Sequence, residues 1–210
     1  MERRLEQLVD GMAARLFRGR MNPVELGSLL VRQADLALRA GPSGPEAPNA
    51  FSVTLGGEPA EAEARERVES ELAAAVEETA AERGWRLAGP VRVRLTLGPG
   101  SPAAATVQTA FISAPLPAWS RLVSSGRQSH EVRPNRAVVG RSSQADVRLA
   151  DPEVSRRHAL LWREAGGIWV ADLGSANGTT LNGVALHQVG ELADGDLLGF
   201  AGSPFVFRSV

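Results

Sequence analysis

The C-terminal part of the sequence, residues 129–210, is constrained most by short apolar alternations that are separated by turn residues. Segments such as HEVRP, DVRLA and GIWVADL alternate apolar and polar side chains, and a period of two is that of a β-strand. Gly, Asn, Asp and Ser recur between these segments and favour tight bends. No segment of this region has the apolar spacing of a helix. The pattern predicts an all-β sandwich built from short strands.

Three polar islands lie between these expected strands, in a fixed order. They are Gly140-Arg141, Ser155-Arg156-Arg157-His158 and Asn177-Gly178-Thr179, the last of which leads to Asn182-Gly183. Their residue types favour loops, and we expect these loops at one end of a sheet. A guanidinium binds phosphate through paired, charge-assisted hydrogen bonds. A serine hydroxyl donates a hydrogen bond, and an asparagine amide both donates and accepts. The islands therefore predict a small site for an anion and a peptide backbone.

This ordered set of motifs, GR followed by SRxH and NGTxxNG, resembles the forkhead-associated (FHA) domain, a β-sandwich that binds phosphothreonine peptides. The resemblance implies phosphopeptide contacts from Arg141, Ser155, Arg156 and Asn177. It also implies support of the site by Gly140, His158, Ser175 and Gly178. Ala176 departs from the family, because some members carry there a hydroxyl residue that adds a phosphate contact.

Each of these residues also has a purely structural interpretation. The chain has no Lys, so every basic side chain is Arg, and an Arg at position 141 is less informative than usual. Ser155 is also typical of a turn, and Asn177 of a left-handed turn with Gly178. A catalytic role for His158 is rejected, because no nucleophile motif or suitably spaced carboxylate accompanies it. A loop-fixing, hydrogen-bonded histidine is expected instead.

Residues 1–97 follow a different pattern, in which helical spacing dominates. Apolar residues recur at helical spacing over residues 4–17, and Asn22-Pro23-Val24-Glu25 reads as a capped start for a helix that runs to about Ala40. A strand is expected over residues 50–55, a helix over residues 59–83 and a strand over residues 91–97, VRVRLTL. The order α-α-β-α-β predicts a small α/β domain separate from the sandwich.

This region resembles the N-terminal domain of FhaA-type actinobacterial proteins. The matching segments are Leu5–Phe17, Asn22-Pro23-Val24-Glu25, Asn49–Leu55 and Gly84-Trp85 through Leu95. The resemblance implies a fold and a protein family, and it identifies no chemistry.

The stretch between the two regions is rich in Pro, Ala and Ser, a composition typical of linkers. The predicted organisation is therefore an FhaA-like α/β domain over residues 1–98, a linker over residues 99–128 and an FHA domain over residues 129–210. Within the linker, residues 105–112 allow a further strand.

The composition excludes several classes of function. The chain of 210 residues has a formal net charge of −1, no Cys and three His, so disulfides, thiolate metal sites and a His-rich metal cluster are not expected. No apolar run reaches the length of a membrane span, and no secretory signal is recognised. The expectation is a cytoplasmic protein without membrane insertion. No catalytic residue, metal site or cofactor is predicted, and the chain is not expected to be an enzyme.

The leading hypothesis is a phosphothreonine-dependent adaptor in bacterial Ser/Thr kinase signalling, which the resemblance links to regulation of the cell wall or of cell division. The partner would be a phosphothreonine-containing protein, either a kinase substrate or a kinase or pseudokinase. A variant of this hypothesis is intramolecular, with Thr106 or Thr109 phosphorylated in the linker. Thr109 is followed three residues later by Ile112, a spacing that FHA-type domains read.

An alternative hypothesis assigns nucleic-acid binding to the N-terminal domain, regulated by a phospho-sensing FHA module. However, the turn Gly19-Arg20-Met21-Asn22 lacks the GxxG backbone clamp of a KH domain. Residues 41–100 also carry ten acidic residues against six Arg, which opposes a basic footprint. Nucleic acid is therefore the disfavoured partner.

Overall fold

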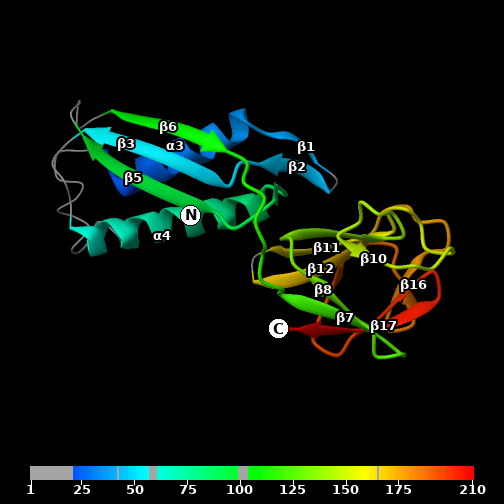
Figure 1. Ribbon diagram of the computed structural model, residues 1–210. Coiled ribbons are helices and arrows are strands. Elements are labelled where there is room, and N and C mark those ends of the chain that lie inside the picture. The colour runs from blue at the N-terminus through cyan, green and yellow to red at the C-terminus, as the bar shows by residue number, and fades with distance from the viewer. Residues whose placement is uncertain (1–20, 42, 57–60, 99–103, 165) are drawn as a thin grey trace. The chain divides into compact units, whose positions relative to one another are not determined.

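The computed structural model describes residues 21–41, 43–56, 61–98, 104–164 and 166–210. The helix predicted over residues 4–17 lies outside these ranges. The described residues form two compact units, and the chain passes from the first to the second after Ala114 (Figure 1). The predicted class, an α/β unit followed by an all-β sandwich, is confirmed. Among the described helices, none is long and apolar enough to cross a membrane.

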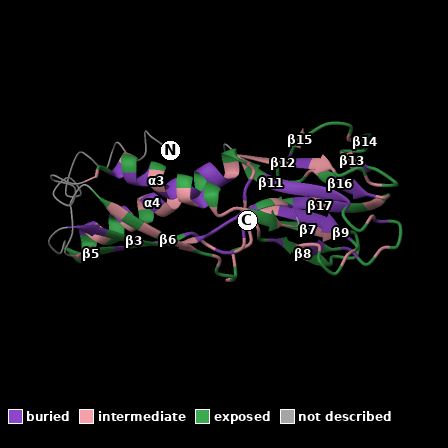
Figure 2. Cartoon of the chain, turned by 90° about the horizontal axis from the view of Figure 1, so that it is seen from above, coloured by how far each residue is buried: buried purple, intermediate pink, exposed green. Residues whose placement is uncertain are grey.

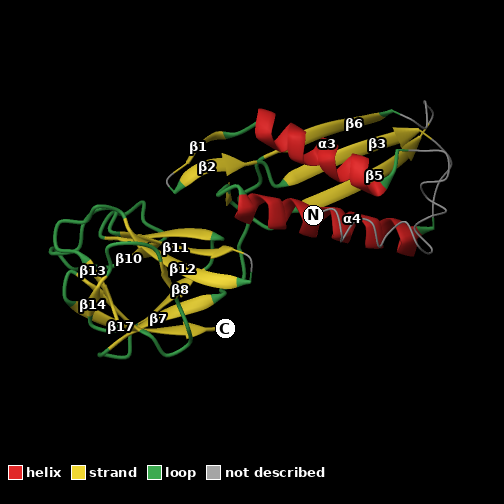
Figure 3. Ribbon diagram, turned by 180° about the vertical axis from the view of Figure 1, so that it is seen from behind, coloured by secondary structure: helices red, strands yellow, loops and turns green. Residues whose placement is uncertain are grey.

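The N-terminal unit packs two helices against one face of a three-stranded sheet (Figures 1 and 3). Its elements are α3 (Pro23–Leu36), β1 (Arg39–Gly41), β2 (Gly44–Ala47), β3 (Ala50–Gly56), α4 (Ala62–Glu82), β4 (Arg86–Leu87), β5 (Arg92–Gly98) and β6 (Ala105–Ala110). The main sheet has the order β5-β3-β6, with β3 parallel to β5 and antiparallel to β6. A second small sheet has the order β1-β2-β4.

Helix α3 begins where the sequence predicts. The Asn22 side chain accepts a hydrogen bond from the Glu25 backbone N at 2.8 Å, and the Glu25 carboxylate accepts from the Asn22 backbone N at 3.2 Å. This capping box satisfies two N–H groups that the first turn leaves free. The helix ends at Leu36 rather than near Ala40. Residues 39–41 instead join a sheet as β1, so tertiary pairing ends the helix early.

The main sheet buries alternate residues, as the VRVRLTL pattern predicts. Phe51, Val53 and Leu55 of β3 are buried with Val93 and Leu95 of β5. These side chains pack in one core with Leu26 and Leu30 of α3 and with Val68 and Leu72 of α4. The intervening residues are exposed on the other face: Ser52, Thr54, Arg92, Arg94 and Thr96. One face of the sheet therefore carries the helices, and the other is polar.

The predicted order α-α-β-α-β is incomplete. The structure adds β1, β2 and β4, of which β2 falls in the Gly- and Pro-rich segment GPSGPEAP. Strand β2 pairs in parallel with β4, with Glu46 opposite Arg86 and Ala47 opposite Leu87. These strands have only two to four residues, and Gly and Pro have low strand propensity. Pairing within the folded unit decides their conformation.

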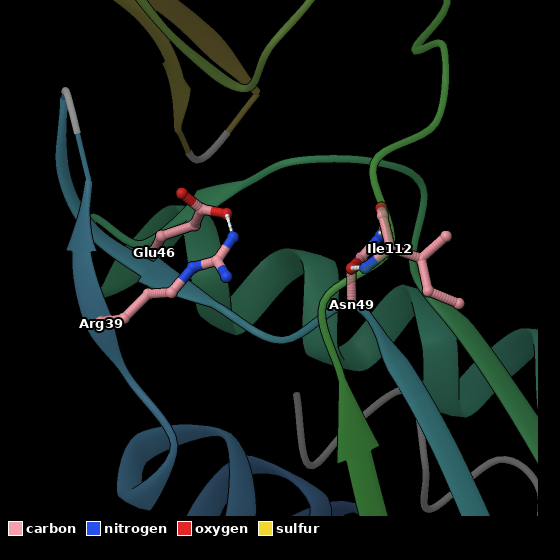
Figure 4. A network of polar contacts seen from close by, with 4 residues as sticks. All are labelled: Arg39, Glu46, Asn49 and Ile112. Carbon is pink, nitrogen blue, oxygen red and sulfur yellow. Dashed lines mark hydrogen bonds and ion pairs between the residues drawn. The ribbon is translucent and has the colours of Figure 1, made fainter.

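Side chains fix the junction between this small sheet and the main sheet (Figure 4). The Asn49 amide donates to the backbone O of Pro90 at 3.2 Å and of Ile112 at 2.9 Å, and its carbonyl accepts from the Ile112 N at 2.8 Å. Beside it, Arg39 forms an ion pair with Glu46 at 2.5 Å. Asn49 is 1% exposed, and its hydrogen bonds join the start of β3, the entry to β5 and the segment after β6.

The C-terminal unit is a sandwich of two sheets (Figure 1). Its strands are β7 (Ser120–Ser124), β8 (Ser129–Val132), β9 (Arg136–Gly140), β10 (Val147–Arg148), β11 (Ala159–Glu164), β12 (Gly167–Asp172), β13 (Thr179–Leu181), β14 (Val184–Ala185), β15 (Gly190–Glu191), β16 (Leu197–Phe200) and β17 (Ser203–Ser209). One sheet has the order β10-β9-β11-β12-β15, and the other has the order β14-β13-β16-β17-β7-β8.

The core of the sandwich is formed by apolar residues of both sheets, which Figure 2 shows as buried. Two residues show where the sequence pattern does not decide which way a side chain faces. Leu197 is 42% exposed, whereas its neighbour Leu198 is fully buried. Val138 is buried, but in a separate small cluster with Leu160 and Trp162. Continuous apolar runs such as LLGF and AVVG hide the alternation from which the facing of a strand is inferred.

Strand β7 lies in the stretch that was predicted as a linker. It pairs with β17 and β8, and Leu122 reaches the core with no exposed surface. Its hydrogen-bonding partner β17 lies some eighty residues further along the chain, as the pairing of Leu122 with Phe207 shows. A strand that depends on such a distant partner has little local signal within a Pro- and Ser-rich stretch.

Candidate functional site

The three polar islands lie in three neighbouring loops that backbone hydrogen bonds join. Beyond the end of β9, the Arg141 N donates to the Ser155 O at 3.0 Å, and the Ser142 N donates to the Arg156 O at 3.3 Å. At Gly140, an added Cβ would lie 2.3 Å from the Arg156 carbonyl oxygen. Only glycine permits this approach without a backbone shift, so Gly140 supports the site by bringing the first two islands together.

Ser155 links the second island to the third. Its Oγ accepts a hydrogen bond from the Ala176 backbone N at 3.0 Å. A hydroxyl that accepts this bond keeps its own proton for a further acceptor. Ala176 thus supplies no side-chain hydroxyl but holds the Ser155 oxygen through its backbone. The Ser155 side chain is half-buried, and its remaining donor can serve an anion at the surface.

His158 is fully buried and fixes two loops at once. Its Nδ1 accepts from the Ser155 backbone N at 3.1 Å, and its Nε2 lies 3.0 Å from the Gly178 carbonyl oxygen. Because a backbone N–H needs an acceptor and a carbonyl needs a donor, this network assigns the proton to Nε2. The ring also packs edge-on against Phe200, with centroids 5.7 Å apart. Both nitrogens are engaged by backbone groups, which leaves none for proton transfer to a ligand.

A half-buried carboxylate that sequence reasoning missed holds the third island. The Asp172 oxygens accept from the Ser175 N at 2.8 Å, the Ser175 Oγ at 2.7 Å and the Thr179 Oγ at 2.6 Å. Burial raises the pKa of Asp172, but the hydrogen bonds from Thr179 and Ser175 outweigh it and hold the pKa below its ordinary value. Ser175 Oγ in turn accepts from the Gly178 N at 2.9 Å. Ser175 therefore has a positioning role through Asp172.

Asn177 is exposed, and its amide nitrogen is fully engaged within the protein. The Nδ2 atom donates to the Glu153 carbonyl oxygen at 3.0 Å and to the Glu153 carboxylate at 2.9 Å. Its Oδ1 atom has no hydrogen-bond partner among the described residues. Glu153 was not identified from the sequence, since nothing in DPEV distinguishes it from any other acidic turn residue.

The Arg side chains of these loops have no partner among the residues that the structure describes. Arg141, Arg156 and Arg157 are all exposed, and in the described part of the chain none of their guanidinium groups forms an ion pair or a hydrogen bond. A guanidinium without an intramolecular carboxylate partner is available to bind an anion. The structure thus brings Arg141, Ser155, Arg156 and Asn177 to three joined loops, with Gly140, His158, Ser175 and Gly178 beneath or within them.

The two threonines of the predicted linker are distant from these loops in the sequence, and both lie in a strand. Thr106 and Thr109 belong to β6, where they pair with Thr54 and Phe51 of β3. Thr106 is exposed and Thr109 is half-buried.

This sandwich with three joined polar loops belongs to a known class: residues 137–201 match the family model of the FHA domain. Residues 1–101 match a second family model, described as the FhaA N-terminal domain. The chain therefore belongs to the proteins that carry a FhaA N-terminal domain followed by an FHA domain, as both resemblances predict.

Comparison with individual proteins gives matches that cover part of the chain. The FHA domain-containing protein FhaA of Mycobacterium tuberculosis is 38% identical over 84 residues, which are 40% of this chain and 16% of that protein. The oxoglutarate dehydrogenase inhibitor of Corynebacterium diphtheriae is 47% identical over 45 residues, 21% of this chain and 32% of that protein. A solved structure, the FhaA FHA domain complexed with the intracellular domain of Rv3910, is 33% identical, with a TM-score of 0.39 and coverage of 44% of this chain and all of that one. The chain thus spans less than a third of the length of these two curated relatives.

Proposed function

We propose that the FHA domain binds phosphothreonine peptides and that the protein is a phosphorylation-dependent adaptor. The observation that carries the proposal is the junction of three loops. These loops carry Ser155 and the exposed Arg141 and Arg156, whose guanidinium groups have no partner among the described residues. Phosphothreonine carries close to two negative charges and three acceptor oxygens at neutral pH. Arg141, Ser155 and Arg156 supply the matching donors.

The arrangement also favours a phosphopeptide over free phosphate. The Asn177 carbonyl oxygen has no partner among the described residues, so it can accept a hydrogen bond from the backbone of a bound peptide beside the phosphorylated residue. The loops are fixed from beneath by His158 and Asp172, so binding costs little ordering of the protein. A site of this kind presents hydrogen-bond donors that are already positioned, and no carboxylate among the described residues pairs with its Arg side chains.

The test is a binding titration of the full chain with phosphothreonine peptides drawn from a degenerate library, with the unphosphorylated peptides as reference. We expect binding only of the phosphorylated form. Arg141→Ala should weaken it by about a hundredfold, because a charge-assisted bidentate contact is worth about 3 kcal/mol. Arg121→Ala on β7 removes an exposed Arg elsewhere on the same domain and is the matched control. Equal binding of both peptide forms, or full binding by Arg141→Ala, contradicts the proposal.

The finer role proposed for the adaptor lies in bacterial Ser/Thr kinase signalling in the cytoplasm, with a link to the cell wall or to cell division. Its partner would be a kinase substrate, a kinase or a pseudokinase. Support comes from the family alone, since the FhaA N-terminal domain accompanies the FHA domain here. Phosphoproteomics of proteins retained by the wild-type chain and by Arg141→Ala would identify the partner, and no difference between the two would contradict this role.

An external ligand fits the site better than the chain's own threonines. Both Thr106 and Thr109 are in β6, which pairs with β3 from Ala105 to Ala110. Presentation of either residue to the FHA loops would require this strand to leave its sheet, at the cost of its hydrogen bonds and of the partly buried Val107. We therefore propose binding in trans.

A further inference from the structure

Glu153 occupies a position that the proposed function does not explain. Its backbone is held by the turn around it, where the Asp151 carboxylate accepts from the Glu153 N at 2.9 Å and the next residue, Val154, is fully buried. Asp151 is itself tied to Ser203 Oγ at 2.6 Å. The Glu153 side chain, by contrast, is exposed. A fixed backbone therefore presents an exposed carboxylate beside Asn177, at the edge of the joined loops.

The two hydrogen bonds between Asn177 and Glu153 differ in kind. The bond to the Glu153 carbonyl joins an amide to a backbone that cannot move away, and it orients Asn177. The bond to the carboxylate, at 2.9 Å, involves a flexible and solvated side chain. A primary amide has two N–H donors, so one donor of Asn177 is committed and the other is held by an exchangeable acceptor.

A carboxylate at this place has an electrostatic consequence. Among the described residues no cation forms an ion pair with Glu153, although three unpaired Arg side chains lie in the joined loops. An incoming peptide that contacts the amide of Asn177 must replace the carboxylate or lie against it. In either case a negative charge remains within a few ångströms of the peptide chain. Interactions between partly exposed charges at such distances are worth about a factor of five in binding.

We propose that Glu153 is a specificity residue of this site, which selects phosphopeptides with a basic residue beside the segment that contacts Asn177 and disfavours acidic ones. The inference rests on the proposed function, because it assigns the class of phosphopeptide that the same site takes. The phosphate is read by the Arg and Ser side chains, and the flanking sequence is read by a single carboxylate of opposite charge.

The experiment compares matched phosphothreonine peptides on the full chain. From the library above, a peptide with neutral flanks is chosen, and each flanking position is changed in turn to Lys and to Glu. We expect one position at which the wild type binds the Lys peptide about fivefold more tightly than the Glu peptide, consistent with one exposed charge pair. In Glu153→Gln, which keeps an acceptor for Asn177 but removes the charge, this ratio should fall to about one. Glu191→Gln, an exposed acid on β15, is the control and should keep the wild-type ratio.

Two outcomes overturn the inference while leaving the proposed function intact. They are phosphopeptide binding that depends on Arg141 but shows no preference between Lys and Glu at any position, and a preference that persists unchanged in Glu153→Gln. Absence of phosphopeptide binding by the wild type would instead contradict the proposed function itself. Because Glu153 is exposed, neither variant is expected to disturb folding, and thermal unfolding of each protein verifies this.

Discussion

Two asparagines show how the units of this protein use the same side chain differently. Asn49 is 1% exposed, and its donors and acceptor all serve the backbone of the N-terminal unit. Asn177 is exposed in the FHA domain, where its carbonyl is open and one of its donors is held by a flexible carboxylate. A polar group whose donors and acceptors are all hydrogen-bonded within the protein stabilises the fold, whereas a group with an unused acceptor can bind a ligand.

The same contrast separates layers within the FHA domain. His158 and Asp172 form hydrogen bonds with backbone and hydroxyl groups of the loops. The guanidinium groups of Arg141 and Arg156 form no hydrogen bond or ion pair with the described part of the chain. His158 and Asp172, the supporting layer, fix the conformation of the loops. Arg141 and Arg156, the binding layer, can therefore keep their guanidinium groups available for a ligand. Substitutions in the two layers should therefore separate stability from binding.

The largest loss is expected for His158→Ala. The change removes a buried ring and leaves the Ser155 N and the Gly178 O without partners, at a cost of about 4 kcal/mol in the free energy of unfolding of the FHA domain. Phosphopeptide binding should be lost with it. Calorimetric unfolding and a peptide titration measure the two effects. Retained stability would mean that the ring does not join the loops, and the layered comparison would fail.

Asn49→Ala should lower the free energy of unfolding of the N-terminal unit by about 3 kcal/mol, because several buried backbone groups lose their partners. Phosphopeptide affinity should stay at the wild-type value. Gln108→Ala, on the exposed face of β6, is the control and should change neither quantity. A loss of phosphopeptide affinity in Asn49→Ala would show that the two units are energetically coupled. It would contradict the view that Asn49 has a purely structural role.

Asp172→Asn should cost about 1 kcal/mol, since an amide replaces a charged acceptor of several hydrogen bonds. The effect should depend on pH. The pKa of Asp172 is lowered in the folded state from 3.8, so its contribution to stability is complete above that pH and is lost as the pH falls through the lower folded-state pKa. Acid unfolding curves of the two proteins should therefore converge at low pH. A stability difference that persists undiminished there would contradict the assignment.

The smallest effect on stability is expected for Asn177→Ala, below about 0.5 kcal/mol, as for other exposed side chains. Its phosphopeptide affinity should nevertheless fall by about tenfold, because a hydrogen bond to the peptide backbone is worth about 1 kcal/mol or more. Denaturant unfolding and peptide titration again separate the two. If stability falls more than affinity, Asn177 belongs with Asn49 as a structural residue.

Sequence alone established the fold class of each unit and its most regular elements, because these signals are local. The capping residues of α3, the helical spacing of α4 and the alternation of β5 each predict an element from a few neighbouring residues, and the GR, SRxH and NGTxxNG islands mark the loops and four candidate contacts. These patterns report side-chain periodicity and turn chemistry, which depend little on the rest of the fold.

Tertiary structure decided what depends on distant partners. Strand β7 needs β17, β2 needs β4, and Leu198 rather than Leu197 faces inward because of the register of β16 with its neighbours. Likewise Asp172 and Glu153 look like ordinary acidic residues in the sequence. Only the folded loops give Asp172 its hydrogen-bond network and Glu153 its place beside Asn177. A hydrogen-bond partner many residues away leaves no periodic pattern in the sequence, so the hydrogen bonds that support the loops and the position of Glu153 beside Asn177 become visible only in the folded chain.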